Sequence, residues 1–139
     1  MNILKGNVTI ITGGGKGIGY GLAEAFAEEG SDLVITGRTS SRLEEAKAKL
    51  EAEYGIKVLP IVADGADEDA IKNVVAQAVA TFGKITTLIN NAQVSKSGVP
   101  LIEHTREDFD LAINSGLYAA FFYMRECYPY LKESHGSVI

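Results

Sequence analysis

The sequence has few of the residues that form disulfide frameworks or metal sites. Its 139 residues include one cysteine and two histidines. The single cysteine, Cys127, excludes an internal disulfide, and its apolar helical context favours a core or interface position. The histidines, His104 and His135, are far apart in the sequence and in no metal-ligand spacing. We therefore expect both on solvated loops and predict no metal site.

Basic clusters and long apolar runs are also missing. The net charge is -5, and no basic patch with interleaved aromatic residues occurs, which argues against a nucleic-acid partner. No apolar run approaches the length of a membrane span, and the N-terminus lacks the basic and apolar regions of a signal peptide. We expect a soluble, cytoplasmic protein with no membrane partner. Its length suits one domain over residues 1–139.

Glycine, in contrast, is plentiful, with 15 residues, and several lie together. Val8–Ile11 is a β-branched run typical of a buried parallel strand, and Thr12–Gly19 follows it as Thr-Gly-Gly-Gly-Lys-Gly-Ile-Gly. Glycine permits a sharp turn and a close approach of the backbone to a pyrophosphate, while the next helix directs free N–H groups at that anion. A plain turn is the alternative. The strand, loop and helix in register favour a dinucleotide-phosphate cradle.

Strands and helices alternate along the rest of the chain. We expect further strands at Asp32 to Thr36, Lys57 to Val62, Ile85 to Ile89 and, as the start of a fifth, Gly136 to Ile139. After the glycine loop and its helix, further helices are expected from a cap at Ser40 or Ser41 to Tyr54, from Asp67 to Gly83, and from about Glu107 to Leu131. This order predicts an α/β fold with a doubly wound parallel sheet of the Rossmann type, in which ligands bind at the carboxyl ends of the strands.

Apolar residues at helical spacing predict which side of each helix faces the sheet. In the first helix they are Ile18, Leu22, Ala25 and Phe26, and Gly30 ends it. In the next two they are Leu43, Ala46, Leu50 and Tyr54, then Ile71, Val74, Val75, Ala78, Val79 and Phe82. The long helix has one face with Phe109, Ile113, Leu117, Ala120, Met124 and Leu131, and another with Leu111, Tyr118 and Phe122. It is apolar nearly all round, which predicts burial on two sides.

The end of the second strand bears on the choice of cofactor. A site specific for NAD has an acidic residue about 20 positions after the glycines, which accepts hydrogen bonds from the ribose 2′-hydroxyl. This sequence has Arg38 there and no carboxylate. Arg38 can bind a 2′-phosphate bidentately, with Thr39 and Ser40 as hydroxyl donors and Lys16 as a second cation. These residues favour NADP(H) over NAD(H), and solvated surface charges are the alternative.

Three sequence segments, taken in their order along the chain, match the pattern of a known protein family. Leu4–Val8 leads into the glycine loop, Asn90-Asn91-Ala92 follows the fourth strand, and Asn114 lies in the long helix. Their order resembles the short-chain dehydrogenase/reductase family from its first strand to its fifth. The resemblance implies the strand order 3-2-1-4-5 and an oxidoreductase that transfers a hydride between nicotinamide and a small carbonyl or alcohol substrate.

The family pattern also implies roles for single residues. Its phosphate loop corresponds to Gly13, Gly17 and Gly19, with Thr12 bracing the turn and Gly15, Lys16 and Ile18 completing the cofactor-binding segment. Asp64 would meet the adenine amino group. Asn90, Asn91 and Ala92 would border the nicotinamide ribose. Asn114 would bend the long helix and hold a water for proton relay, with an ordinary residue at a helix bend as the alternative.

The chain also departs from this pattern. Gln93 stands where the family usually has glycine, and Gly65 where it commonly has an apolar residue. The family's catalytic serine and Tyr-x-x-x-Lys pair follow the fifth strand and have no counterpart in these residues. Tyr128 and Lys132 have the spacing of that pair but precede the fifth strand, with Pro129 between them, so we expect a solvated helix end there. We expect the cofactor half of an enzyme, truncated after the start of the fifth strand.

Three functions remain open from the sequence. The chain is the cofactor half of an NADP(H)-dependent oxidoreductase, a catalytically inactive nucleotide-binding remnant, or a subunit-interaction module with a vestigial nucleotide site. In the short-chain dehydrogenase/reductase family, which this chain resembles, the long helix also packs against the same helix of a second subunit. We therefore expect a homo-oligomer formed through the helix around Glu107 to Leu131, whose outer apolar patch would otherwise be exposed.

Overall fold

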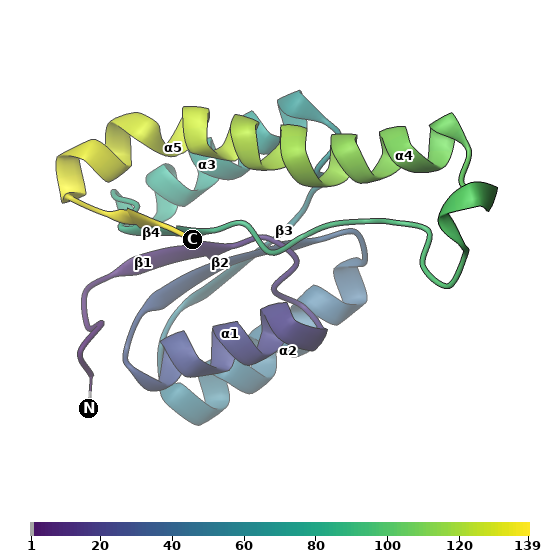
Figure 1. Ribbon diagram of the computed structural model, residues 1–139. Coiled ribbons are helices and arrows are strands. Elements are labelled where there is room, and N and C mark those ends of the chain that lie inside the picture. The colour runs from purple at the N-terminus through teal and green to yellow at the C-terminus, as the bar shows by residue number, and fades with distance from the viewer. Residues whose placement is uncertain (1) are drawn as a thin grey trace.

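The computed structural model describes residues 2–139 as a parallel sheet covered by helices on both faces (Figure 1). The strands are β1 (Val8–Ile11), β2 (Asp32–Gly37), β3 (Val58–Val62), β4 (Thr87–Ile89) and β5 (Ser137–Val138). Their order in the sheet is β3-β2-β1-β4-β5, and all neighbours are parallel. The predicted doubly wound sheet and its strand order are confirmed.

The helices divide between the two faces of this sheet (Figure 1). On one face lie α1 (Gly17–Glu28) and α2 (Ser40–Tyr54). On the other lie α3 (Glu68–Phe82) and a long helical segment made of α4 (Arg106–Ala112), the π-helical turn η2 (Ile113–Tyr118) and α5 (Ala119–Ser134). A short 3-10 turn, η1 (Leu101–Glu103), lies in the connection between β4 and α4. No helix within residues 2–139 is long and apolar enough to cross a membrane.

Successive side chains of each strand serve the two faces, because side chains alternate along a strand. In β1, Ile10 packs in the cluster that contains α3 and α5, whereas Ile11 packs in the cluster that contains α1 and α2. In β4, Leu88 and Ile89 divide in the same way. Burial on both faces explains why these strands read as continuous apolar runs in the sequence.

The helix ends agree with the sequence in most places. The Asp67 side chain caps α3 by accepting from the backbone N–H groups of Asp69 and Ala70, as predicted. Gly30 follows α1 with a positive φ of 88°. The predicted serine cap of α2 is wrong, since the N-cap residue is Thr39 and no side chain makes a capping hydrogen bond there.

The buried face of α1 differs in part from the predicted one. The buried residues are Gly19, Ala23 and Ala27, which let the helix lie close to the sheet. Ile18 is 79% exposed and Ala25 is also exposed, so neither belongs to the packing face. The predicted Leu22 and Phe26 are partly buried and pack against the core cluster on this side, so the prediction is confirmed for these two residues and wrong for Ile18 and Ala25.

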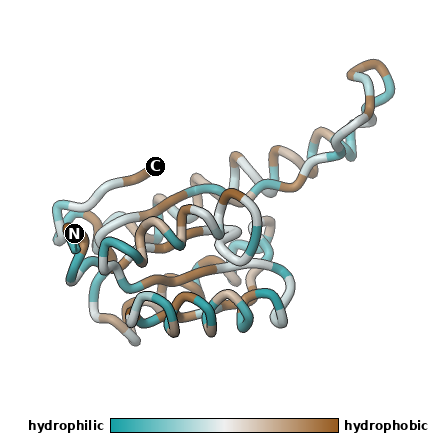
Figure 2. Tube along the Cα trace, turned by 90° about the horizontal axis from the view of Figure 1, so that it is seen from below, coloured by the Kyte–Doolittle hydropathy of each residue, from teal (hydrophilic) through white to brown (hydrophobic). Residues whose placement is uncertain are grey.

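The long helix is neither uniform nor oriented as predicted. Its boundaries are Arg106 and Ser134, and the π-helical turn interrupts it at Ile113–Tyr118, around the expected bend. The buried residues are Ser115, Ala119, Tyr123, Cys127 and Leu131, of which the predicted faces included only Leu131. Cys127 is fully buried, as expected for a core position. The α4 end with η1 extends away from the rest of the chain (Figure 2).

The two histidines differ in their surroundings. His135 is exposed at the end of α5. His104 is partly buried, and its Nε2 lies 3.1 Å from the carbonyl oxygen of Val99, so the prediction of a solvated loop residue holds only for His135.

Candidate functional site

A cavity of about 550 Å³ lies along the carboxyl ends of the strands. The loops after β1, β2, β3 and β4 and the start of α5 line it. The residues predicted to bind cofactor border it, with the exception of Ser40, and those on the lining are Thr12, Gly13, Gly15, Lys16, Gly17, Ile18, Gly19, Arg38, Thr39, Asp64, Asn90, Asn91 and Ala92. Asn114 does not line the cavity; it is exposed within η2, beside the lining residues Ser115 and Gly116.

The glycine loop is shaped by two positions that favour glycine for different reasons. Gly17, the first residue of α1, has a positive φ of 55°, a conformation that side chains disfavour. A Cβ atom at Gly19 would lie 2.0 Å from the carbonyl oxygen of Gly13 and 2.7 Å from the side-chain nitrogen of Asn91. The start of α1 therefore lies directly against the loop after β1, and its backbone is bare toward the cavity.

Thr12 joins the glycine loop to the loop after β4. Its hydroxyl oxygen accepts hydrogen bonds from the backbone N–H groups of Asn91, at 3.0 Å, and Ala92, at 2.9 Å. The Asn91 side chain donates in turn to the Thr12 carbonyl at 3.0 Å. The predicted phosphate loop and the predicted Asn-Asn-Ala segment thus form one hydrogen-bonded unit. The sequence had placed Thr12 in the cofactor-binding loop as a brace of the turn, and did not indicate its contact with the segment after the fourth strand.

Thr36, near the end of β2, holds the other side of the glycine loop. Its hydroxyl and carbonyl oxygens accept from the backbone N–H groups of Gly13, at 3.4 Å, and Gly14, at 3.1 Å. Behind it the buried Tyr123 borders the cavity. Burial raises the pKa of Tyr123 to about 12, although a hydrogen bond with Thr36 acts in the opposite direction. This phenol is protonated at neutral pH.

Ser115 connects the π-helical turn to the segment after β4. Its hydroxyl lies 2.9 Å from both the backbone nitrogen and the carbonyl oxygen of Val94, and 2.7 Å from the carbonyl oxygen of Leu111. The neighbouring Gln93 lines the cavity and lies against Gly116, where an added Cβ would be 3.4 Å from the Gln93 Cγ. Gln93 therefore occupies a place between the cavity and η2, and the structure accommodates it by packing it on a glycine.

The end of the cavity near β2 is electropositive. Three cationic side chains line it, Lys16, Arg38 and Arg42, and none of them forms an ion pair with any residue among positions 2–139. The helices α1 and α2 begin at this cavity without a side-chain cap, whereas Asp67 caps α3 and Thr105 caps α4. Uncapped N-termini present free N–H groups and a positive dipole end, so this region suits an anion.

Arg42 was not among the predicted site residues. It lies in the first turn of α2 and lines the cavity together with Arg38. Its position in the first turn of the helix that follows the second strand is the signal that would have found it.

Two further lining groups are chemically distinct. Asp64 is the only acidic residue on the lining, and its Oδ1 accepts from the Ala66 backbone N–H at 2.9 Å. Among residues 2–139, the Oδ1 atom of Asn90 is the only buried side-chain nitrogen or oxygen without a hydrogen-bond partner. An unpaired buried acceptor is costly, so a donor from a ligand is expected to meet it.

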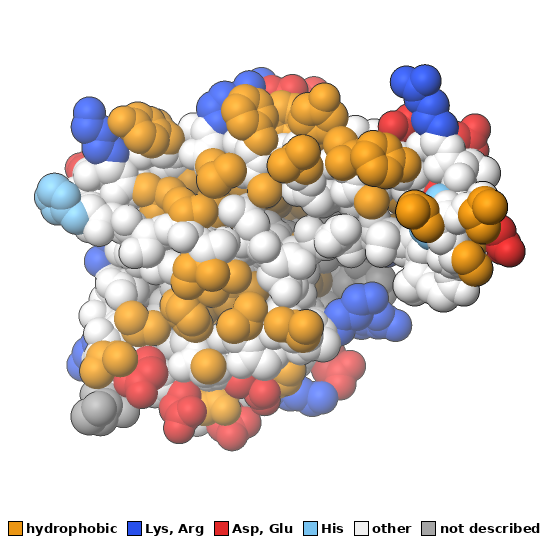
Figure 3. Space-filling view, in the orientation of Figure 1, with side chains coloured by type: hydrophobic (Ala, Val, Ile, Leu, Met, Phe, Trp, Pro, Cys, Tyr) orange, Lys and Arg blue, Asp and Glu red, His pale blue; other side chains and the backbone are white. Residues whose placement is uncertain are grey.

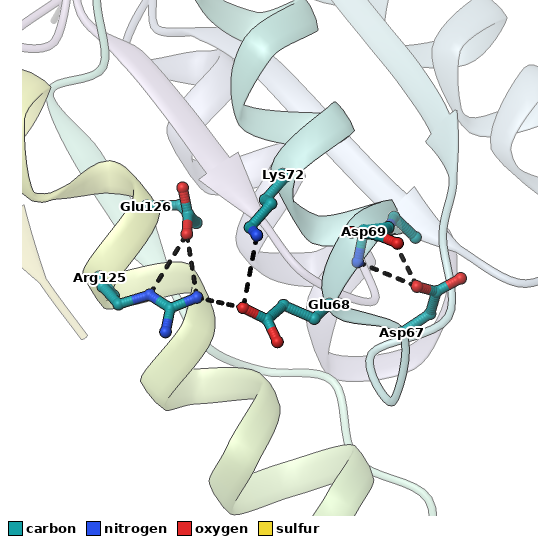
Figure 4. Close-up of polar contacts among 7 residues, drawn as sticks. Asp67, Glu68, Asp69, Lys72, Arg125 and Glu126 are labelled. Carbon is teal, nitrogen blue, oxygen red and sulfur yellow. Dashed lines mark hydrogen bonds and ion pairs between the residues drawn. The ribbon is translucent and has the colours of Figure 1, made fainter.

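The remaining charged residues near the long helix lie outside the cavity. Arg125 of α5 contacts Glu68 of α3 and Glu126, and Glu68 also pairs with Lys72 at 3.6 Å (Figure 4). These contacts join the two helices on the outer side of the molecule. Within residues 2–139, no group of three or more histidine, cysteine or acidic side chains is arranged to hold a metal ion.

The Tyr-x-x-x-Lys sequence in α5 is not part of the site. Tyr128 is 62% exposed, and neither it nor Lys132 lines the cavity. Cys127 next to it is buried, which together with the nearby Glu126 carboxylate raises its thiol pKa to about 12. Tyr128 and Lys132 therefore lie too far from the carboxyl ends of the strands to take part in chemistry there.

Comparison with known proteins gives relatives over the whole chain. The model of the short chain dehydrogenase family matches residues 7–139. The 12α-hydroxysteroid dehydrogenase of Clostridium sp. is 57% identical over 145 aligned residues, which cover 100% of this chain and 56% of that enzyme. The gluconate 5-dehydrogenase of Gluconobacter oxydans is 37% identical over 86% of the chain and 46% of its own length. The chain spans about half the length of these relatives.

Solved structures of dehydrogenases and reductases are also similar to this chain over nearly its whole length. The L-sorbose reductase of Gluconobacter frateurii, in complex with NADPH and L-sorbose, superposes with a TM-score of 0.92 at 31% identity and covers 99% of this chain and 53% of its own. An NAD+-bound xylitol dehydrogenase superposes with a TM-score of 0.91 at 28% identity and covers 98% of this chain and 52% of its own. Proteins of this fold thus bind either cofactor.

Proposed function

The chain belongs to the short-chain dehydrogenase family, and from this premise we propose that residues 1–139 form the NADP(H)-binding domain of an oxidoreductase. The reaction would move a hydride between nicotinamide and a carbonyl or a secondary alcohol. Nicotinamide, when bound, supplies or accepts that hydride. The bare cradle at Gly19 and the unpaired Asn90 Oδ1 fit such a dinucleotide. Because the chain spans about half of its relatives, turnover belongs to the full-length protein.

The proposal assigns each part of the cofactor to lining residues. The Gly13–Gly19 loop and the start of α1 would hold the pyrophosphate, because backbone N–H groups and the helix dipole favour an anion there. Asp64 would meet the adenine amino group, and the Asn90–Ala92 segment the nicotinamide ribose. Asn114 is proposed to hold a water molecule rather than the cofactor, in keeping with its exposed position outside the lining.

The observation that carries the choice of NADP(H) is the free Arg38 guanidinium. It borders the cavity at the end of β2 without an ion pair, next to Thr39, and no carboxylate stands at this end to accept bonds from a ribose 2′-hydroxyl. A planar guanidinium can bind a phosphate through two hydrogen bonds. Lys16 and Arg42 add positive charge at the same end.

Fluorescence titration of the full-length protein with NADPH and NADH tests this assignment. We expect tighter binding of NADPH. Arg38→Ala should weaken NADPH binding by about 10- to 100-fold, the loss of a charge-assisted contact, and leave NADH binding nearly unchanged. A strict preference for NADH in the unaltered protein would contradict the proposal.

The relative of 57% identity suggests a substrate class. We propose that the full-length protein acts on a hydroxysteroid, oxidising a 12α-hydroxyl group or reducing the corresponding ketone. Reduction of NADP+ followed by absorbance, with a 12α-hydroxysteroid and the same steroid lacking that hydroxyl, tests this. Equal rates with the two compounds, or none with either, would contradict the steroid proposal without affecting the cofactor assignment.

We also propose that the protein is a homo-oligomer through the outer side of the long helix. Exposed apolar side chains gather there, seen as orange groups above the centre of Figure 3, and include Phe109, Leu111, Leu117, Tyr118, Phe121 and Met124. Several large apolar side chains exposed along one helix are typical of a protein interface. A second copy of the chain would bury it.

A further inference from the structure

A groove of about 260 Å³ runs between α1 and α2, next to the cofactor cavity. Its lining residues are Gly15, Lys16, Gly17, Tyr20, Arg42, Glu45, Ala46 and Lys49. Four of them also line the main cavity, namely Gly15, Lys16, Gly17 and Arg42. The two cations at the mouth, Lys16 and Arg42, therefore face both spaces, and the charges inside the groove act on the same region as the 2′-phosphate proposed above.

Glu45 has two cations within helical reach. It follows Arg42 by three residues and precedes Lys49 by four, and side chains at both spacings are neighbours on a helix. The structure pairs it with Lys49, whose ammonium lies 2.7 Å from Glu45 Oε1. The Lys49 hydrogen bond lowers the pKa of Glu45, and Glu45 in turn raises the pKa of Lys49. Arg42 is left without an ion pair.

The lining cations of the groove are Lys16, Arg42 and Lys49, and of these only Lys49 is absent from the lining of the main cavity. From α1 the facing side chain is Tyr20, whose pKa is raised by burial first and by the neighbouring Glu24 second. The Glu24 and Glu45 carboxylates thus both act electrostatically on Lys49. Lys49 is the lining cation paired with Glu45, and without it the nearest cation within helical reach of Glu45 is Arg42.

We infer that Lys49 is a selectivity residue for the phosphorylated cofactor: by holding Glu45 it keeps the Arg42 guanidinium free to meet the 2′-phosphate. Lys49 itself does not line the main cavity, so it acts through Arg42 as a positioning residue. This inference rests on the proposed NADP(H) preference. It adds that selectivity for NADPH requires the Glu45–Lys49 pair, which lies outside the cofactor cavity.

The test compares NADPH and NADH dissociation constants in the full-length protein and its variants at low ionic strength. Lys49→Ala is expected to weaken NADPH binding by about threefold, the scale of an exposed charge pair, and NADH binding by less than about 1.5-fold. Adding Glu45→Gln to Lys49→Ala should restore NADPH binding. In an Arg42→Ala background, Lys49→Ala should have no further effect. Lys47→Ala, which removes the other pair of α2, with Glu51 at 3.8 Å, is the matched control and should change neither constant.

The possible outcomes distinguish the role of Lys49 from the proposed preference for NADP(H). Unaltered selectivity in Lys49→Ala, or an equal loss for both cofactors, overturns the role of Lys49 alone. An additional loss in the Arg42→Ala background shows that Lys49 acts directly and overturns the route through Arg42. Equal binding of NADPH and NADH by the unaltered protein overturns the cofactor assignment, and this inference with it.

Discussion

Asn91 donates two hydrogen bonds of 3.0 Å to Thr12, one from its backbone N–H to the Thr12 hydroxyl and one from its side-chain amide to the Thr12 carbonyl. The two residues lie 79 positions apart in the sequence, at the ends of neighbouring strands β1 and β4. This pair fixes the loop that carries the glycines relative to the segment that follows β4. The geometry of the cofactor site thus depends on contacts between protein groups as well as on contacts with the ligand.

Replacement of Thr12 by valine should destabilise the protein. Valine has nearly the same shape but no acceptor, so the Asn91 and Ala92 N–H groups lose their partner at a part-buried position. An unsatisfied buried donor costs about 1–3 kcal/mol, and the free energy of unfolding measured in urea should fall by that amount. Thr12→Ser keeps the hydroxyl and should retain most of the stability. Unchanged stability in Thr12→Val, or a larger loss in Thr12→Ser than in Thr12→Val, would contradict this role of the hydroxyl.

Two glycines of α1 should respond in opposite ways to alanine. At Gly19 the new Cβ would lie 2.0 Å from the Gly13 carbonyl oxygen, so the cradle must open and NADPH binding should be lost. At Gly21, which is exposed and has nothing within 4 Å of the added atom, alanine should stabilise the helix by up to about 1 kcal/mol. NADPH titration and thermal unfolding of both variants check this. Unimpaired NADPH binding in Gly19→Ala would contradict the proposed position of the pyrophosphate.

A charge on the outer side of the long helix should dissociate the proposed oligomer. Leu117 is 65% exposed in η2, and a glutamate there would have to be buried unpaired between subunits. Sedimentation velocity should show Leu117→Glu as a monomer at concentrations where the unaltered protein is associated. Ala25→Glu puts the same charge on α1, on the opposite face of the sheet, and should leave association unchanged. A monomeric unaltered protein would contradict the interface.

The sequence was sufficient to predict the sheet, because strand and helix differ in period and the boundaries have clear signals. Val8–Ile11 was predicted without error, and Asp67 was identified as the start of α3. The glycine loop carried enough chemical information to indicate which residues surround the cavity. These features depend on local sequence, which is available before any tertiary contact is known.

The packing of the long helix was beyond the sequence, for a physical reason. When apolar residues occur on all sides, hydrophobic periodicity no longer selects a face, and the buried stripe contains Ser115 and Cys127 rather than the largest side chains. The π-helical turn at Ile113–Tyr118 also shifts the phase between α4 and α5. The Ser115 contact with Val94 joins residues 21 positions apart and has no local signature.

Alkaline pH should destabilise the protein through two buried groups. Burial raises the pKa of Cys127 from 9.0 to about 12 and that of Tyr123 from 10.0 to about 12. The folded state therefore holds these protons more tightly than the unfolded state. Their contribution to stability is fully present below pH 9 and is lost as the pH rises toward 12, at up to about 1.4 kcal/mol per pH unit for each group.

Urea unfolding at pH 8.0 and at about pH 10.5 measures this loss, since an ionised thiol or phenol in the core would be desolvated without a partner. Cys127→Ala and Tyr123→Phe each remove one of the two groups and should lose less stability between these pH values than the unaltered protein. Tyr128→Phe removes a phenol that is 62% exposed and should leave the pH dependence as it was. If all three variants lose as much stability as the unaltered protein, the alkaline transition arises elsewhere, because neither buried proton can then be the one that folding retains.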